Sequence, residues 1–225
     1  MASKKTFWSE LRAYADARGS AFLAAVVIIG GQAWLANALA VQPVWLFPTV
    51  TTVLLIASAV IYRSEREEPS TQMRWVARGL VGVLILANAL SLLGLVRGVF
   101  LQPTLDPVGL LLAGVVLWAV NIAVFALAYW EVDGGGPEDR ARGARRLPDL
   151  VFPQQQADQE GLAPEGWTPG FLDYVYVSVT AATAFSPTDA MPYSKTAKVL
   201  MGLESTMSIA IFAMVVARAV NIAKG

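Results

Sequence analysis

The stretch SVTAATAFSPTDAMP, residues 178–192, gathers oxygen-bearing side chains around a proline. Its candidate ligands are the hydroxyls of Thr183, Ser186 and Thr188 and the carboxylate of Asp189. Oxygen atoms of these types replace the hydration shell of inorganic cations. A further carboxylate, Glu204, lies in the last long apolar run, where acidic residues are rare and mark functional positions. These residues predict cation-binding chemistry.

The composition of the whole chain restricts the class of protein. Of 225 residues, 56% are hydrophobic and 15% are charged, whereas a soluble domain has about 25% charged residues. This composition predicts a membrane protein with the lipid bilayer as its solvent. Lys and Arg number 17, equal to Asp and Glu, so no excess of positive charge indicates nucleic acid as a partner.

Residues that commonly carry catalysis are also missing from the sequence. The chain has no Cys and no His, which excludes disulfides, thiol nucleophiles and Cys/His metal sites. No glycine-rich phosphate loop follows a predicted strand, and the GLEST motif at residues 202–206 has no activating base. We expect neither an enzyme nor a bound cofactor.

Four apolar runs of spanning length fill the first half of the chain, since about 20 helical residues cross a hydrocarbon core of about 30 Å. They are Ser20–Ala40, Val44–Tyr62, Ala77–Val96 and Val108–Trp130. The short connections within each pair predict antiparallel helical hairpins. We therefore expect an N-terminal lead-in over residues 1–19 and a four-helix membrane domain over residues 20–130.

Glycines, prolines, arginines and a polar tract follow, and they predict a flexible aqueous linker over residues 131–170. Its apolar Leu-Val-Phe at residues 150–152 is expected to dock as a turn. Two apolar stretches come next. Phe171–Ser186 reaches only about 24 Å as a helix, whereas Ala197–Ile222 is long enough to cross. A short helix, a polar turn and a full span are typical of a re-entrant hairpin.

Residues 171–221 resemble the pore module of the tetrameric pore-loop cation channels, which include potassium channels, in a degenerate bacterial form of unknown function. The matching positions are YVYVSVT at residues 174–180, Thr183, Asp189, Pro192 and Glu204. The resemblance implies an all-α polytopic bundle, with four N-terminal spans and a pore-helix, loop and inner-helix hairpin over residues 171–225. It also implies a homotetramer that passes inorganic cations across the cell membrane.

The loop departs from the potassium-channel pattern because it contains no glycine. Its residues are Thr183, Ala184, Phe185, Ser186, Pro187, Thr188 and Asp189. Filter carbonyls point at the pore axis because glycines adopt backbone angles that other residues resist, and Pro187 restricts the chain further. We expect weakly selective cation passage, with Asp189 forming an acidic ring. The same residues also read as an ordinary turn in which Thr or Asp caps the next helix.

The distribution of basic residues leaves two topologies open. With six spans, only Arg97, Lys195 and Lys198 lie opposite the N-terminus, so 14 of the 17 basic residues share its side, which predicts a cytoplasmic N-terminus. If residues 171–186 instead re-enter from the cytoplasmic side, the split is again 14 against 3. We favour six spans, although the charge rule fits both.

Polar residues within the apolar runs have two interpretations each. Glu204 lines the pore or braces the loop, or else it is a hydrogen-bonded residue that fixes helix packing. Asp173 suits a helix N-terminus. Interhelical hydrogen bonds are expected for Gln32, Asn37, Asn88, Asn121 and Asn221. The alternative functions are a small-solute or ion transporter with its site at Glu204, and a non-conducting membrane scaffold.

Overall fold

The computed structural model shows an all-α bundle. It describes residues 2–39, 43, 45–53, 56, 71–101, 106–141, 147–156, 167–183 and 190–224. The elements are α1 (Ala2–Ala38), α3 (Thr71–Leu101), α4 (Pro107–Val132), η1 (Asp133–Gly135), α5 (Pro137–Ala141), β1 (Leu150–Val151), η2 (Pro153–Gln155), α6 (Phe171–Ala182), β2 (Met191–Pro192) and α7 (Lys195–Lys224). Residues 46–53 form a further helical segment between α1 and α3.

Four of the described helices are long and apolar enough to cross a membrane. They cover Gly19–Ala38, Trp75–Leu101, Pro107–Gly135 and Lys195–Val220. These ranges confirm three of the four N-terminal spans predicted from hydropathy and the last long span. The remaining predicted span, Val44–Tyr62, is described only at residues 45–53 and 56. The lead-in over residues 1–19 is helical from Ala2 and runs into the first span without a break.

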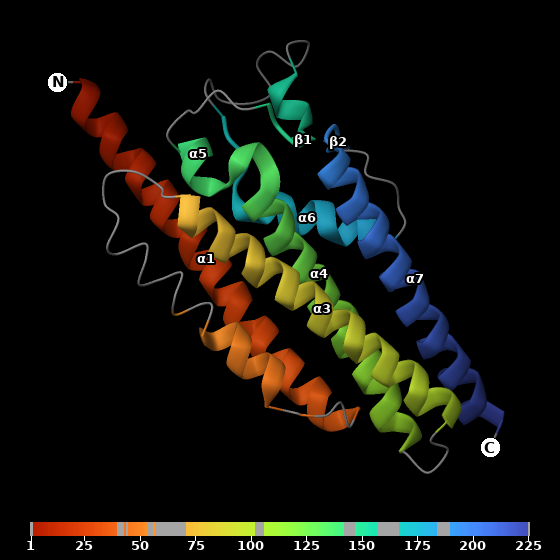
Figure 1. Ribbon diagram of the computed structural model, residues 1–225. Helices are drawn as coiled ribbons and strands as arrows, with labels where there is room; N and C mark the ends of the chain where they lie inside the picture. The colour runs from red at the N-terminus through yellow and green to blue at the C-terminus, as the bar shows by residue number, and fades with distance from the viewer. Residues whose placement is uncertain are drawn as a thin grey trace.

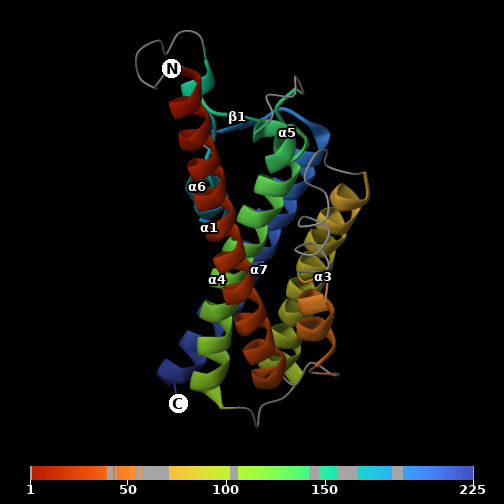
Figure 2. The ribbon, with the colours of Figure 1, turned by 90° about the vertical axis from the view of Figure 1, so that its left-hand side faces the viewer.

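Helix α4 forms the centre of the bundle and contacts α1, α3, α6 and α7 (Figure 1). Seven consecutive residues from Val124 to Trp130 are buried, which is the pattern of a helix covered on all sides. Glycines permit the close approach of its neighbours: a Cβ added at Gly31 of α1 would lie 2.6 Å from Val120 Cγ2 of α4. A second view shows α4 running between α1, α3 and α7 (Figure 2).

The start of α4 is fixed by its own sequence. Asp106 accepts hydrogen bonds from the backbone N–H groups of Val108 at 3.2 Å and Gly109 at 2.8 Å. Pro107 occupies the first helical position, where its missing N–H is not needed. This cap satisfies backbone groups that would otherwise be unpaired at the membrane boundary.

The linker expected over residues 131–170 is ordered where the structure describes it. Asp133, at the end of α4, is buried, and its Oδ1 accepts from the backbone N–H groups of Asp149 at 2.8 Å and Leu150 at 2.9 Å. Leu150 and Phe152 are buried, which confirms that the Leu-Val-Phe turn docks on the bundle. The polar composition of this segment predicted solvent exposure. Instead, the buried carboxylate of Asp133 holds the backbone of residues 149 and 150 in place.

The segment before the last span is shorter than its apolar sequence indicates. Helix α6 has 12 residues and measures about 18 Å, less than the hydrocarbon core of about 30 Å. Tyr174 Oη donates to Asp133 Oδ2 at 2.7 Å, so α6 begins beside the end of α4. Ser205 Oγ of α7 donates to the Ala181 carbonyl at 3.1 Å, about 15 Å along α7 from its start. Helix α6 therefore ends beside α7 about 15 Å from the start of that helix, a distance equal to half of a hydrocarbon core of about 30 Å.

The chain then returns to the end from which α6 entered. Strands β1 and β2 pair antiparallel, with Leu150 opposite Pro192 and Val151 opposite Met191. The backbone N–H of Tyr193 also donates to the Asp149 carbonyl at 2.8 Å. Both strands lie at the end of the bundle where α4 finishes and α7 starts (Figure 1). The six-span arrangement does not fit this geometry, because α6 enters and returns on one side.

Candidate functional site

The structure describes only the first residue of the expected pore loop. Thr183 ends α6, and its hydroxyl donates to the Val179 carbonyl at 2.8 Å, with the Thr180 carbonyl at 3.3 Å. The other loop candidates, Ala184, Phe185, Ser186, Pro187, Thr188 and Asp189, lie outside the described residues. The hydroxyl proton of Thr183 is therefore used at the end of α6, while its oxygen can still accept a hydrogen bond.

Glu204 lies where three helices meet. Its side chain is 0% exposed. Oε2 accepts a hydrogen bond of 2.5 Å from the Tyr129 hydroxyl of α4, and Oε1 is hydrogen-bonded to the Ser178 hydroxyl of α6. This arrangement favours the brace over the pore-lining interpretation, because both carboxyl oxygens are occupied by neighbouring helices. A solute site at Glu204 would require these bonds to break.

Ser178 contacts two oxygen atoms with a single hydroxyl proton. Ser178 Oγ contacts two oxygens, the Ile122 carbonyl at 2.8 Å and Glu204 Oε1. A hydroxyl has one proton to donate, and a carbonyl can only accept. Ser178 therefore donates to one of these oxygens at a time, and a proton on Oε1 would satisfy both contacts at once. Neither Tyr129 nor Ser178 carries a charge, so a neutral carboxyl avoids placing an unpaired anion in hydrocarbon.

A chain of amide side chains continues from this brace across the bundle. Asn121 Nδ2 of α4 donates to Ser208 Oγ at 2.9 Å and lies 3.4 Å from the Glu204 backbone carbonyl, both on α7. Asn88 Nδ2 of α3 donates to Asn121 Oδ1 at 2.6 Å. These bonds confirm the interhelical role predicted for Asn88 and Asn121, and they join α3, α4 and α7 at one level.

The other predicted amide contacts have different outcomes. Gln32 Nε2 of α1 donates to the Leu84 carbonyl of α3 at 3.2 Å, which confirms its interhelical role. Asn37 instead donates to Ala33 of its own helix at 2.9 Å and is exposed, so that prediction is wrong. The side chain of Asn221 lies outside the described residues. Asp173 accepts from the Gly170 N–H at 2.7 Å at the start of α6, as predicted.

The end of the bundle where α4 finishes carries a cluster that was not predicted from the sequence. Arg140 donates from Nη1 to the Asp133 carbonyl at 2.5 Å and from Nη2 to the Trp130 carbonyl at 2.9 Å, which caps the end of α4. Its guanidinium lies 5.1 Å from the centre of the Tyr174 ring. The sequence offered one signal for this packing: Tyr174 and Ser178 are four residues apart, which places both on one face of a helix.

Among the described residues, no group of three or more acidic, His or Cys side chains could hold a metal ion. Gln32 Oε1 and Asn88 Oδ1 are buried and have no hydrogen-bond donor. Their orientations are fixed, because each amide nitrogen faces an oxygen that accepts its hydrogen.

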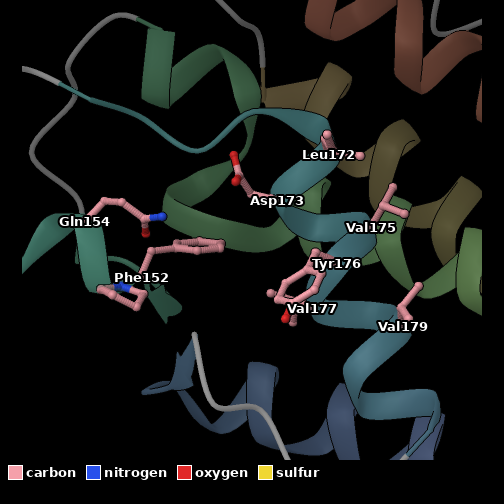
Figure 3. Close-up of a pocket in the computed structure, with 9 residues that line it drawn as sticks. Phe152, Gln154, Leu172, Asp173, Val175, Tyr176, Val177 and Val179 are labelled. Carbon is pink, nitrogen blue, oxygen red and sulfur yellow. The ribbon is translucent and has the colours of Figure 1, made fainter. Parts of the chain in front are cut away.

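The outer face of α6 borders a groove of about 660 Å³ (Figure 3). Its lining residues are Phe152, Pro153, Gln154, Leu172, Asp173, Val175, Tyr176, Val177 and Val179. Residues 152–154 of this set belong to the segment around η2, and the others belong to α6. The groove is thus formed between α6 and the segment around η2.

No protein-family model, curated protein or solved structure matches this chain.

Proposed function

We propose that the protein passes inorganic cations, with weak selectivity, through an oligomer built around the α6, loop and α7 hairpin, with a homotetramer as the assembly. The observation that carries this proposal is the depth at which α6 ends. Thr183 and Ser205 satisfy carbonyls at the end of α6, so this end is stable beside α7, and irregular backbone that continues at membrane depth has to be buried in protein or line water.

The end of α6 is electrostatically suited to a cation. The C-terminal end of a helix carries a partial negative charge of about half an elementary charge. Thr183 adds a hydroxyl oxygen at this end, and the sequence supplies Ser186, Thr188 and Asp189 directly after it. A loop without glycine does not support a ladder of inward carbonyls, so charge selection by acidic and hydroxyl oxygens is favoured over potassium selectivity.

In this proposal Glu204 is a positioning residue. It holds α6 between α4 and α7 through Tyr129 and Ser178 and does not touch the ion. The protein is placed in the cell membrane with its N-terminus in the cytoplasm and its C-terminus outside. In this orientation only Arg97, Arg218 and Lys224 of the 17 basic residues lie outside, in agreement with the positive-inside rule.

Purified protein in liposomes tests this function directly. Imposed cation gradients should dissipate in the presence of the protein, and Asp189→Asn should lower the flux several-fold without changing the amount reconstituted. Asp106→Asn is the matched control, because Asp106 caps α4 at the opposite end of the bundle and asparagine also caps. Absence of flux across a range of potentials and ions, from protein shown to be intact, would overturn the proposal.

A further inference from the structure

The groove beside α6 changes from polar to apolar along its length. Helix α6 enters beside the end of α4, and Asp173 lies in its first turn. Val179 lies six residues deeper, about 9 Å along the helix. In Figure 3 the side chains of Gln154 and Asp173 extend toward each other, and Val175 and Val179 follow along α6. The groove thus joins headgroup level to hydrocarbon level.

Among the described residues, the lateral face of this groove carries exposed side chains. Leu172 is 78% exposed, and Tyr176 is also exposed. Among the described residues, no spanning helix covers these two side chains, so in a membrane they would be available to lipid. A tyrosine at this depth suits the boundary between headgroups and acyl chains. A volume of about 660 Å³ is in the range of sites that hold one small amphipathic molecule.

The charges of the residues that line the groove indicate which headgroup it binds. Asp173 is the charged residue among the nine that line the groove, and no Lys or Arg accompanies it. Its Oδ2 accepts from the Gly170 N–H, and Oδ1 has no hydrogen bond among the described residues. A carboxylate with a free oxygen attracts an ammonium group. It repels the phosphate diester of a lipid whose headgroup has no ammonium group.

We propose that this groove binds one phospholipid with a primary-amine headgroup, its ammonium at Asp173 and Gln154 and an acyl chain along Val175 and Val179. A quaternary ammonium keeps the charge but has no N–H to donate, so choline lipids bind more weakly. Anionic glycerol lipids bind weakest, because their phosphate has no compensating amine. The site is independent of whether the assembled protein conducts ions.

Native mass spectrometry of the full-length protein in detergent tests this proposal with phosphatidylethanolamine, phosphatidylcholine and phosphatidylglycerol of identical acyl chains. We expect ethanolamine lipid to bind about tenfold more tightly than glycerol lipid, with choline lipid between them. Asp173→Asn should remove this preference, because asparagine still accepts from Gly170 but lacks the charge. Asp106→Asn should leave the lipid preference unchanged, because it makes the same change at a helix cap at the other end of the bundle.

Two further variants identify the place of binding and the occupant. Val175→Trp fills the groove and should reduce binding of all three lipids. Leu172→Cys introduces the sole thiol of the chain, since the sequence has no Cys. Equal binding of the three lipids, or binding unchanged in Asp173→Asn or Val175→Trp, would overturn the proposal. Disulfide-linked dimers of Leu172→Cys in native membranes would also overturn it, by showing that a second copy covers the groove.

Discussion

The Tyr129 hydroxyl of α4 and Glu204 of α7 are joined by a hydrogen bond of 2.5 Å although 75 residues separate them in the sequence. Ser178 of α6 occupies the other carboxyl oxygen. One side chain therefore connects the central helix, the last span and the re-entrant helix. Its position explains how a helix too short to cross the membrane is held at depth.

Substitution of Glu204 by Gln should be tolerated. A glutamine amide reproduces the protonated carboxyl, because its oxygen accepts from Tyr129 and its nitrogen donates to Ser178. Glu204→Leu leaves the Tyr129 hydroxyl unpaired and should cost about 1–3 kcal/mol. Thermal unfolding in detergent, followed by tryptophan fluorescence, measures both changes. A glutamine variant as unstable as the leucine variant would show that Glu204 is ionised in the brace.

The re-entrant topology makes a labelling prediction. The exposed residues Leu147 and Tyr193 flank α6, and both should lie on the N-terminal side of the membrane. Single cysteines at either position should react with a membrane-impermeant maleimide from the cytoplasmic face, whereas a cysteine at Asp106 should react from the outside. The chain has no other thiol, so the signal is specific. Labelling of positions 147 and 193 from opposite faces would instead establish six spans.

The cluster around Asp133 should control the order of residues 147–156. Asp133→Leu removes the acceptor for two backbone N–H groups and for the Tyr174 hydroxyl, and should cost about 2–4 kcal/mol. Limited proteolysis should then cut the segment faster. Tyr174→Phe removes a single bond and should cost about 1 kcal/mol. Equal protection of the wild type and Asp133→Leu would contradict this role.

The two unpaired amide oxygens predict unequal effects of two similar substitutions. Asn88→Leu leaves Asn121 Oδ1 without its donor and should destabilise the bundle by about 1–3 kcal/mol. Gln32→Leu removes one hydrogen bond together with one unpaired acceptor, so its effect should be within about 1 kcal/mol. The two unfolding midpoints give the comparison. Similar losses in both variants would indicate that a bound group already satisfies Gln32 Oε1.

Hydropathy was sufficient to predict the described spans, because each is a long apolar run bounded by polar residues. Hydropathy did not give the topology of α6. The distribution of basic residues did not decide it either, because both arrangements leave 14 basic residues on one side. The partners of Glu204 were also beyond reach, because Tyr129 and Ser178 are distant in sequence and follow from tertiary packing. The amides were predictable in kind, since buried polar groups in a membrane seek partners, but their pairing was not.

The hydrogen bonds of α6 reach both backward and forward along the chain, to Ile122 on one side and to Glu204 and Ser205 on the other. During synthesis α6 leaves the ribosome before α7 exists, and it is too short to halt in the translocation channel as a membrane anchor. Its contacts with Glu204 and Ser205 therefore form only after the final helix has been inserted. A protein truncated before Glu204 would retain α1, α3 and α4 but would lack the partner on α7 that joins α6 to the bundle.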